Sequence, residues 1–279
     1  MKRWVPFFFL TLLMTNCHTV DSPASWECFS DSLFAQASPS FFHELYPEQE
    51  SLRLNVYTPA LWSRNYRSIP VCWEDSAFRH KRYQKRRKLV KETVKETWEK
   101  TLSTLEDGTI IPDDIRVQFV GWHRCNEDFN EGIRIQIADQ APTSLIGMQY
   151  EGEEHTMTLN FDFKKWNTLS CYFQKSFCIK AITVHEFGHA LGFLHEQARK
   201  DTPKECTEEI NKEITTDFYG DGWDLHSVMN YCNPDWNNLG DLSPRDKRWA
   251  RVVYYPEYYP DLSCLPIDEA KTKIKENSF

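Results

Sequence analysis

The sequence has few of the residues that dominate repetitive or disordered chains, with 10 glycines and 14 prolines among 279 residues. This scarcity excludes collagen-like and low-complexity architectures. The mean hydropathy of −0.60 excludes a polytopic membrane protein. The chain also lacks an excess of basic residues: its formal net charge is −8, so we expect no general nucleic-acid binding. Its 41% apolar residues, in contrast, can form a substantial core.

No apolar run near the N-terminus is long enough to cross a bilayer. Trp4 to Met14 forms an apolar run of 11 residues after the positive pair Lys2 and Arg3. This length and charge order are typical of a signal peptide. We therefore predict a signal peptide over residues 1–16 and export to the extracellular space or the cell envelope. A strand or buried helix at the start of the domain is the alternative.

Cys17 directly follows this leader and is a candidate lipidation site. Residues 13–17 resemble a bacterial lipobox, whose cysteine is acylated after cleavage, although Asn16 stands where a small residue is usual. A bacterial outer-membrane lipoprotein is therefore one form of the predicted envelope location. Residues 17–65 have an irregular pattern with scattered serine and proline, which indicates an N-terminal linker or a prosegment.

The chain contains nine cysteines but no Cys-x-x-Cys, which argues against a thiolate zinc site or a thioredoxin-type redox motif. Without the lipidation candidate, eight cysteines remain, and an exported chain can form up to four disulfides from them. We predict a local bridge from Cys171 to Cys178 and a second one from Cys206 to Cys232. For Cys28, a disulfide is favoured over a thiolate that caps a metal ion.

The hydrophobic pattern predicts short strands interrupted by two long helices. Such an order indicates an α+β layer architecture. The expected strands are 69–73, 115–120, 133–137, 145–150 and 157–163, and the expected helices are 79–105 and one that begins after an N-cap at Ser176.

The first predicted helix is amphipathic and strongly basic at its start. Its apolar stripe consists of Val90, Val94, Trp98, Leu102 and Leu105. Residues 81–91 contain seven lysines or arginines, a pattern that can bind nucleic acid or anionic lipid. Because acidic residues follow within the same helix, a solvated outer face is the favoured interpretation.

The second predicted helix carries a metal-binding pattern. His185 and His189 are four residues apart, so both imidazoles lie on one helix face and can share one Zn²⁺ ion. Glu186 lies beside them and can reach a water molecule at the metal. Gly192 can take a positive φ and end the helix, so that His195 returns to the same ion. Three histidines leave one coordination position open, as in catalytic zinc sites. A buried helix whose histidines pair with protein neighbours is the structural alternative.

This pattern resembles the extended zinc signature of the metzincin metalloproteases. The continuation through Phe193, Glu196, Arg199 and Asp201 is similar to that of the astacin subgroup. A second stretch, residues 223–231, resembles the astacin Met-turn, with matches at Asp224, Ser227, Met229 and Tyr231. Residues 242–246 resemble the entry to the family's C-terminal helix, and a Ser-Pro-x-Asp start suits a helix N-terminus independently.

The resemblance implies a metzincin-like α+β domain. It would contain a twisted, mostly parallel five-stranded sheet and two long helices over residues 66–192. A smaller, irregular C-terminal subdomain over residues 193–279 would lie below the active-site cleft.

The resemblance also implies the roles of the site residues. His185, His189 and His195 would bind one Zn²⁺, and Glu186 would act as general base toward a zinc-activated water. Tyr231 would be a movable ligand that stabilises the oxyanion. Met229 would pack beneath the metal and Glu196 would engage the mature N-terminus, while Gly192 shapes the turn.

The implied activity is a secreted or lipid-anchored zinc endopeptidase that acts as a monomer on proteins or peptides. Contact with a membrane would occur only through Cys17, and nucleic acid is not an expected partner. An inactive zinc-containing binding module and an amidase for a non-protein amide are the alternatives. Residues 18–65 contain no match to the family's inhibitory prosegment motif, so the activation mechanism stays open.

Overall fold

The computed structural model describes most of the chain between Leu54 and Tyr259. The described residues are 26–28, 54–126, 132–148, 155–199, 201–206, 217–219, 222–259 and 264–266. Within these residues, no helix combines the length and the apolar character needed to cross a membrane. The predicted signal peptide, the lipobox and Cys17 lie outside the described residues.

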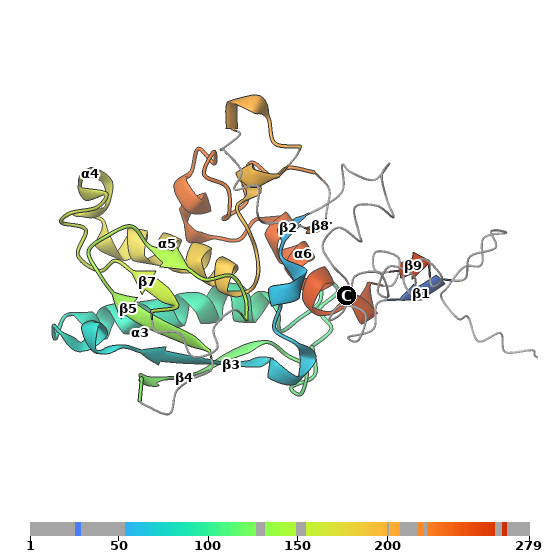
Figure 1. Cartoon of the computed structure of the whole chain (residues 1–279), viewed down its shortest axis with the longest axis horizontal. Coiled ribbons are helices and arrows are strands. Elements are labelled where there is room, and N and C mark those ends of the chain that lie inside the picture. The colour runs from blue at the N-terminus through green and yellow to red at the C-terminus, as the bar shows by residue number, and fades with distance from the viewer. Residues whose placement is uncertain are drawn as a thin grey trace, which may run out of the picture.

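A five-stranded sheet forms one layer of the domain (Figure 1). Its strand order is β4-β3-β5-β7-β6, and only the edge strand β6 runs antiparallel to its neighbour. The strands are β3 (Ser68–Trp73), β4 (Gln118–Arg124), β5 (Ile133–Ile137), β6 (Thr143–Ser144) and β7 (Met157–Leu159). This mostly parallel five-stranded sheet, with helices packed beside it, confirms the predicted α+β class.

Two long helices pack against each other beside this sheet (Figure 1). The first is α3 (Tyr83–Val94), which continues without a break into a π-helical turn, η5 (Lys95–Glu99). The second is α5 (Lys175–Ala190), which is buried almost completely from Cys178 onward. The π-turn places the Trp98 side chain between the helices, where Trp98 Nε1 donates to the Val184 carbonyl at 2.8 Å. The core therefore continues directly into the helix that carries the candidate ligands.

The remaining elements are short, apart from α6 (Pro244–Tyr254). Two further two-stranded sheets are antiparallel: β1 (Trp26–Cys28) with β9 (Cys264–Pro266), and β2 (Leu54–Val56) with β8 (Asp217–Tyr219). The other helical turns are α4 (Thr168–Cys171), η2 (Thr58–Ala60), η3 (Arg64–Tyr66), η4 (Asp75–Phe78), η6 (Glu196–Ala198), η7 (Lys204–Cys206), η8 (Trp236–Gly240) and η9 (Pro256–Tyr258).

Several predicted boundaries differ from the observed ones. The strand expected at 115–120 begins at Gln118, because Ile115 belongs to the turn that precedes it. The N-cap expected at Ser176 is Gln174, and α5 begins at Lys175, between the two cysteines of the Cys171–Cys178 bridge. Residues 54–65, expected in the linker, pack into the domain: Val56 and Trp62 are buried there.

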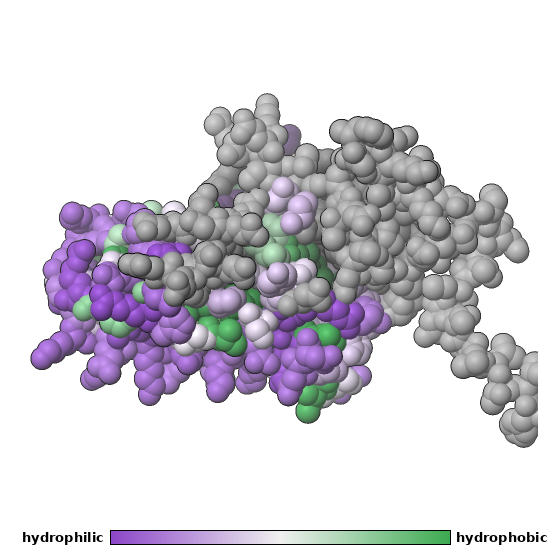
Figure 2. Space-filling view, turned by 60° about the horizontal axis from the view of Figure 1, so that its bottom comes forward, coloured by the Kyte–Doolittle hydropathy of each residue, from purple (hydrophilic) through white to green (hydrophobic). Residues whose placement is uncertain are grey.

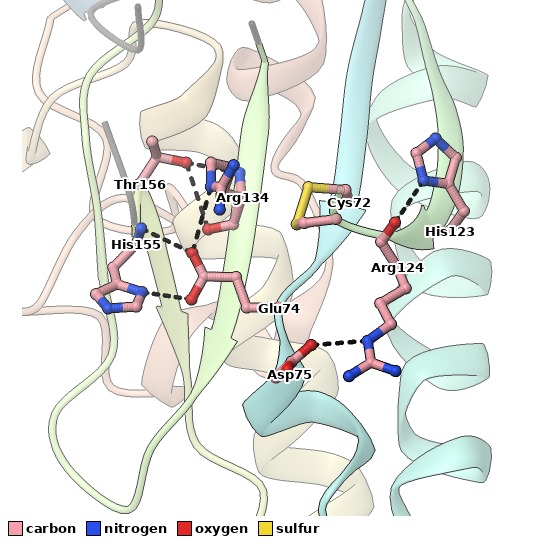
Figure 3. The surroundings of a disulfide bond; sticks show 9 residues. Cys72, Glu74, Asp75, His123, Arg124, Arg134, His155 and Thr156 are labelled. Atoms are coloured by element: carbon pink, nitrogen blue, oxygen red, sulfur yellow. Dashed lines mark hydrogen bonds and ion pairs between the residues drawn. A yellow bond between two sulfur atoms is a disulfide. The ribbon is translucent and has the colours of Figure 1, made fainter. Parts of the chain in front are cut away.

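Three disulfides join described residues, and two of them confirm the predictions: Cys171–Cys178 and Cys206–Cys232. The third, Cys72–Cys125, links the neighbouring parallel strands β3 and β4 near their carboxyl ends. Figure 3 shows its surroundings, where the Glu74 carboxylate accepts a hydrogen bond from the His155 backbone N–H at 2.9 Å and faces Arg134. This bridge closes a sequence separation of 53 residues.

We expect removal of the Cys72–Cys125 bridge to destabilise the fold more than removal of Cys171–Cys178. Loop-closure entropy predicts a loss of about 4 kcal/mol for the longer loop and about 2.5 kcal/mol for the shorter one. The measurement is the free energy of unfolding in denaturant for the paired variants Cys72→Ala/Cys125→Ala and Cys171→Ala/Cys178→Ala. Equal losses, or a larger loss for the shorter loop, would contradict this ranking.

Candidate metal centre

The C-terminal end of α5 is held by side chains and backbone from three distant segments. Trp62 Nε1 donates to the Ala190 carbonyl at 2.7 Å, and the Tyr254 hydroxyl donates to the Leu191 carbonyl at 2.8 Å. The Gly147 N–H donates to the His189 carbonyl at 2.9 Å. These contacts satisfy carbonyls that a helix end leaves without partners. The last turn of α5, which presents the histidines, is thereby fixed in position.

Gly192 turns the chain back toward the helix that it has just left. Its φ is +94°, and the Phe193 N–H donates to the Gly188 carbonyl at 3.0 Å, as in a Schellman-type ending. Asn55 then fixes the returning strand: its Nδ2 donates to the His195 carbonyl at 2.6 Å. The Leu194 N–H donates to the Asn55 carbonyl at 3.0 Å. The turn and the β2 segment together bring His195 to the two helical histidines.

The three histidines converge on one point. Their candidate ligand atoms all lie within 4.8 Å of one another, and the Nε2 atoms of His189 and His195 are 3.1 Å apart. His185 Nδ1 lies 2.8 Å from the Val228 carbonyl, and His189 Nδ1 lies 2.7 Å from the Phe193 carbonyl. Because a carbonyl can only accept, each of these Nδ1 atoms carries the proton, and each Nε2 presents a lone pair.

A zinc ion fits this donor set. Tetrahedral Zn²⁺ with Zn–N bonds of about 2.0–2.1 Å separates two ligand nitrogens by about 3.4 Å, close to the 3.1 Å between His189 and His195 Nε2. His185 Nε2 is buried and has no hydrogen-bond partner, as expected of an atom that binds a metal. Burial lowers the pKa of His185 to about 4 and that of His195 to about 3, so both rings are neutral ligands at pH 7. His185, His189 and His195 form a zinc-binding triad.

Glu186 directly follows the ligand His185 in α5. Its carboxyl group is buried, and its Oε2 has no hydrogen-bond partner. Burial raises the pKa of Glu186 to about 8. A dication at the adjacent imidazoles opposes this effect, because it favours the ionised carboxylate. The group can therefore exchange a proton near neutral pH.

Tyr231 and Met229 come from the same turn but point to different surroundings. The Tyr231 ring is 51% exposed, and its centroid lies 4.4 Å from that of His195 and 5.3 Å from that of His185. Met229 is buried, and a Cβ atom on Gly188 would collide with its sulfur. Met229 thus packs against the zinc-binding helix, whereas Tyr231 borders the open side of the site.

Glu196 lies behind the triad in a buried polar cluster. Its Oε1 accepts the Asp224 N–H at 3.0 Å and lies 3.4 Å from Arg199 Nε. Burial raises the pKa of Glu196 to about 8, although the Arg199 charge opposes the shift. Arg199 also makes a two-pronged contact with the Asp201 carboxylate at 2.7 and 2.6 Å. The continuation of the histidine motif therefore forms one ionic unit that holds the segment after His195.

The α6 N-terminus fixes the turn that contacts His185. Ser243 and Asp246 form a capping box, as the Ser-Pro-x-Asp pattern predicts. The Asp246 carboxylate also reaches across to the turn before Tyr231: it accepts the Ser227 hydroxyl at 2.7 Å and the Val228 N–H at 2.9 Å. Since the Val228 carbonyl faces His185 Nδ1, Asp246 is one residue removed from a metal ligand.

Comparison with known proteins identifies the segment that contains this site. Residues 167–249 match the model of the astacin peptidase family. Within this segment the chain is similar to astacin peptidases. This match covers the triad, the returning turn and the capping box, which are the parts from which the resemblance was inferred.

The relatives that this chain matches have low sequence identity to it. It is 28% identical over 143 residues to zinc metalloproteinase dpy-31 of Caenorhabditis elegans, which covers 43% of this chain and 22% of the relative. It is 34% identical over 92 residues to zinc metalloproteinase nas-34 of the same organism. This match covers 27% of this chain and 15% of the relative. The chain thus spans less than a quarter of each of these relatives.

Solved structures with a similar arrangement include myroilysin, at a TM-score of 0.47 and 20% identity, which covers 72% of this chain and 98% of that one. A second is a hatching-enzyme zinc protease from Oryzias latipes, at a TM-score of 0.40 and 17% identity. This match covers 70% of this chain and 94% of the hatching enzyme.

Two contributors to the astacin-like site were not found from the sequence. Asn55 lies in the stretch assigned to the linker, and only its pairing across to His195 reveals its role. The Trp98 indole, expected merely as core, also bonds to the backbone of the zinc-binding helix. Neither residue belongs to a local motif, so no spacing pattern indicates it.

We expect Asp246→Ala to destabilise the protein by about 3–5 kcal/mol, because several buried donors lose their acceptor at once. Asp246→Asn retains a carbonyl oxygen for the N–H donors, so it should cost only about 1–2 kcal/mol. The exposed Asp241, which pairs with Lys180, is the control, and Asp241→Ala should change stability by less than about 0.5 kcal/mol. The measurement is the unfolding free energy of the three variants, and equal costs for Asp246→Ala and Asp241→Ala would refute the supporting role.

Proposed function

We propose that the chain is an exported zinc-dependent endopeptidase that hydrolyses peptide bonds in proteins or peptides. The observation that carries this proposal is the convergence of three imidazoles that present lone pairs to one point. It is supported by Glu186, which directly follows His185 in α5 and whose buried Oε2 has no hydrogen-bond partner. A structural zinc site has no need of such an acid, because its four ligands complete the coordination. Three histidines with a neighbouring proton acceptor favour a catalytic site.

In this proposal, zinc held by His185, His189 and His195 supplies Lewis acidity toward the scissile carbonyl and the attacking water. Glu186 accepts the proton of that water and delivers it to the leaving amine. A bound dication would favour the ionised form of Glu186, which is the form that accepts a proton, and the buried surroundings would favour its return to the leaving group.

Tyr231 supplies a hydrogen-bond donor to the oxygen that becomes negative during the attack. Its half-exposed ring stacks on His185 and lies tilted against His195, so its hydroxyl can approach a substrate at the site without a backbone change. The Tyr231 backbone N–H donates to Gln197 Oε1 at 3.0 Å, which holds the main chain while the side chain stays accessible. Met229 and Gly192 support the site through packing and the turn.

Export is the part of the proposal that rests on the predicted leader and on the disulfides. Three bridges among described residues favour an oxidising compartment. The finer proposals are a signal peptide over residues 1–16, a lipid at Cys17, a linker or prosegment after it, and a monomeric catalytic domain up to residue 279. Proteolytic trimming within 18–65 would free the domain from a lipid at Cys17.

We expect Glu186→Gln to keep one zinc per chain and to lose about 10²–10⁴-fold in the rate of cleavage of an unfolded protein. The amide keeps the shape of the carboxyl but cannot accept the proton. A chelator should abolish the activity of the wild-type protein, and added zinc should restore it. Glu257→Gln, at an exposed ion pair with Arg64, is the matched control and should behave as wild type.

The alternatives give different results in the same assay. Wild-type protein that binds zinc but cleaves no protein, even after trimming of residues 18–53, would indicate an inactive binding module or an amidase for another substrate. Cleavage by Glu186→Gln at the wild-type rate would disprove the role of Glu186 but leave zinc binding intact.

We expect Tyr231→Phe to lower kcat by about 10²–10³-fold, the scale of one lost oxyanion donor. Phenylalanine keeps the ring against His195 and removes only the hydroxyl, so zinc affinity and the unfolding free energy should not change. Steady-state kinetics with a peptide substrate measures the effect. A rise in KM with unchanged kcat would instead assign Tyr231 to substrate binding.

A further inference from the structure

Apolar side chains protrude from the turn between β7 and α5. Leu169 and Phe173 are 95% and 89% exposed, and Tyr172 beside them is also exposed. We call these three residues the apolar tip. The tip is built on α4, which stands out at one end of the molecule (Figure 1), and the Cys171–Cys178 bridge fastens it to α5. A disulfide-closed turn that presents leucine and phenylalanine to solvent is not explained by the core or by the zinc site.

Lysines surround the apolar tip. Residues 164–175 contain three lysines and no acid, and Lys175 Nζ lies 3.7 Å from the centre of the Tyr172 ring. The basic start of the first long helix lies at the same end of the molecule (Figure 1): residues 79–91 contain eight lysines or arginines and no acid. This end lies on the left in Figure 2 as well, where its surface is predominantly hydrophilic.

Asp162 joins the two basic segments into one surface. Its Oδ1 accepts from Arg82 at 2.8 Å, and its backbone carbonyl accepts from Lys175 Nζ at 2.6 Å. A second acid, Asp139, accepts the backbone N–H groups of Lys164 and Lys165 at 3.1–3.3 Å. Both acids are thus engaged within the fold, whereas the side chains of Lys81, Lys85, Lys164 and Lys165 are exposed.

We propose that the apolar tip and the surrounding lysines dock this end of the protein onto a bilayer that contains anionic phospholipid. Lysines attract an anionic surface, and Leu, Tyr and Phe side chains enter the boundary between headgroups and acyl chains. The tip is convex and presents its apolar atoms outward, which suits insertion into a lipid surface. This contact is separate from the proposed protease activity and from a lipid at Cys17.

Charge and shape favour this occupant over others. A second copy of the chain would bring the same lysines face to face, which is repulsive. A soluble polyanion would satisfy the lysines but give no contact to Leu169 and Phe173. A bilayer satisfies both features at once. The proposal adopts the anionic-lipid alternative for residues 81–91 in place of the favoured solvated face. The reason is that this basic segment adjoins an apolar element that the sequence pattern did not indicate.

The test is sedimentation with vesicles, using residues 18–279 so that neither the leader nor Cys17 contributes. All described elements begin at Trp26 or later. One set of vesicles is equimolar phosphatidylcholine and phosphatidylglycerol, and the other is phosphatidylcholine alone. We expect binding to the first set only. Leu169→Ser/Phe173→Ser should weaken it at least about tenfold, and Lys85→Gln/Lys164→Gln/Lys165→Gln about a hundredfold.

The matched control is Ile110→Ser/Lys247→Gln. Ile110 is 69% exposed and follows the opposite end of the long first helix, and Lys247 is exposed on α6. This variant should bind as wild type. Thermal unfolding and peptide cleavage confirm that every variant is folded, and the single substitution Phe173→Ser replaces the double one if that unfolds.

Three results would overturn the proposal. The first is no binding to anionic vesicles. The second is equal weakening by the control variant. The third is binding that the lysine variant loses, the apolar variant keeps, and a soluble acidic polysaccharide displaces; this would identify a polyanion site instead of a membrane contact.

Discussion

The buried carboxylate of Asp246 connects the two halves of the zinc site. It closes the N-terminus of α6 through Ser243, and it holds the turn of Ser227 and Val228 by two further hydrogen bonds. Burial raises the pKa of Asp246 to about 6, so at neutral pH the group is ionised and these bonds are charge-assisted. Because the Val228 carbonyl sets the tautomer of His185, the metal site depends on a charge that never contacts the metal.

The rest of the site follows from one helix held at both ends. The Cys171–Cys178 bridge fixes where α5 begins, and Trp62 and Tyr254 satisfy its final carbonyls. Trp98 bonds to its middle. A histidine pair four residues apart then needs only the Gly192 turn to obtain its third partner. Packing of the core therefore offsets most of the free-energy cost of ordering the three histidines before any metal binds.

The sequence predicts those features that depend on local spacing, and it misses those that depend on the sheet. The histidine motif and the capping box at Ser243 lie within a few turns of chain, and the two predicted disulfides join cysteines 7 and 26 positions apart. Cys72 and Cys125, in contrast, meet only because β3 and β4 are parallel neighbours, with the Cys125 N–H donating to the Trp73 carbonyl. Asn55 likewise meets His195 through the fold across 140 positions. Pairings of this kind leave no period in the sequence.

The length of the continuous α5 helix also fixes the distance between the apolar tip and the zinc site. The helix advances about 21 Å between Lys175, beside the apolar tip, and His189 at the zinc site, at 1.5 Å per residue. A surface that the tip contacts would consequently be kept at a fixed separation from the reaction centre. Peptide segments that project from that surface by about six or seven extended residues could reach the centre, while those lying flat could not. In the proposed protease, this separation would restrict substrates to segments that extend that far from the surface.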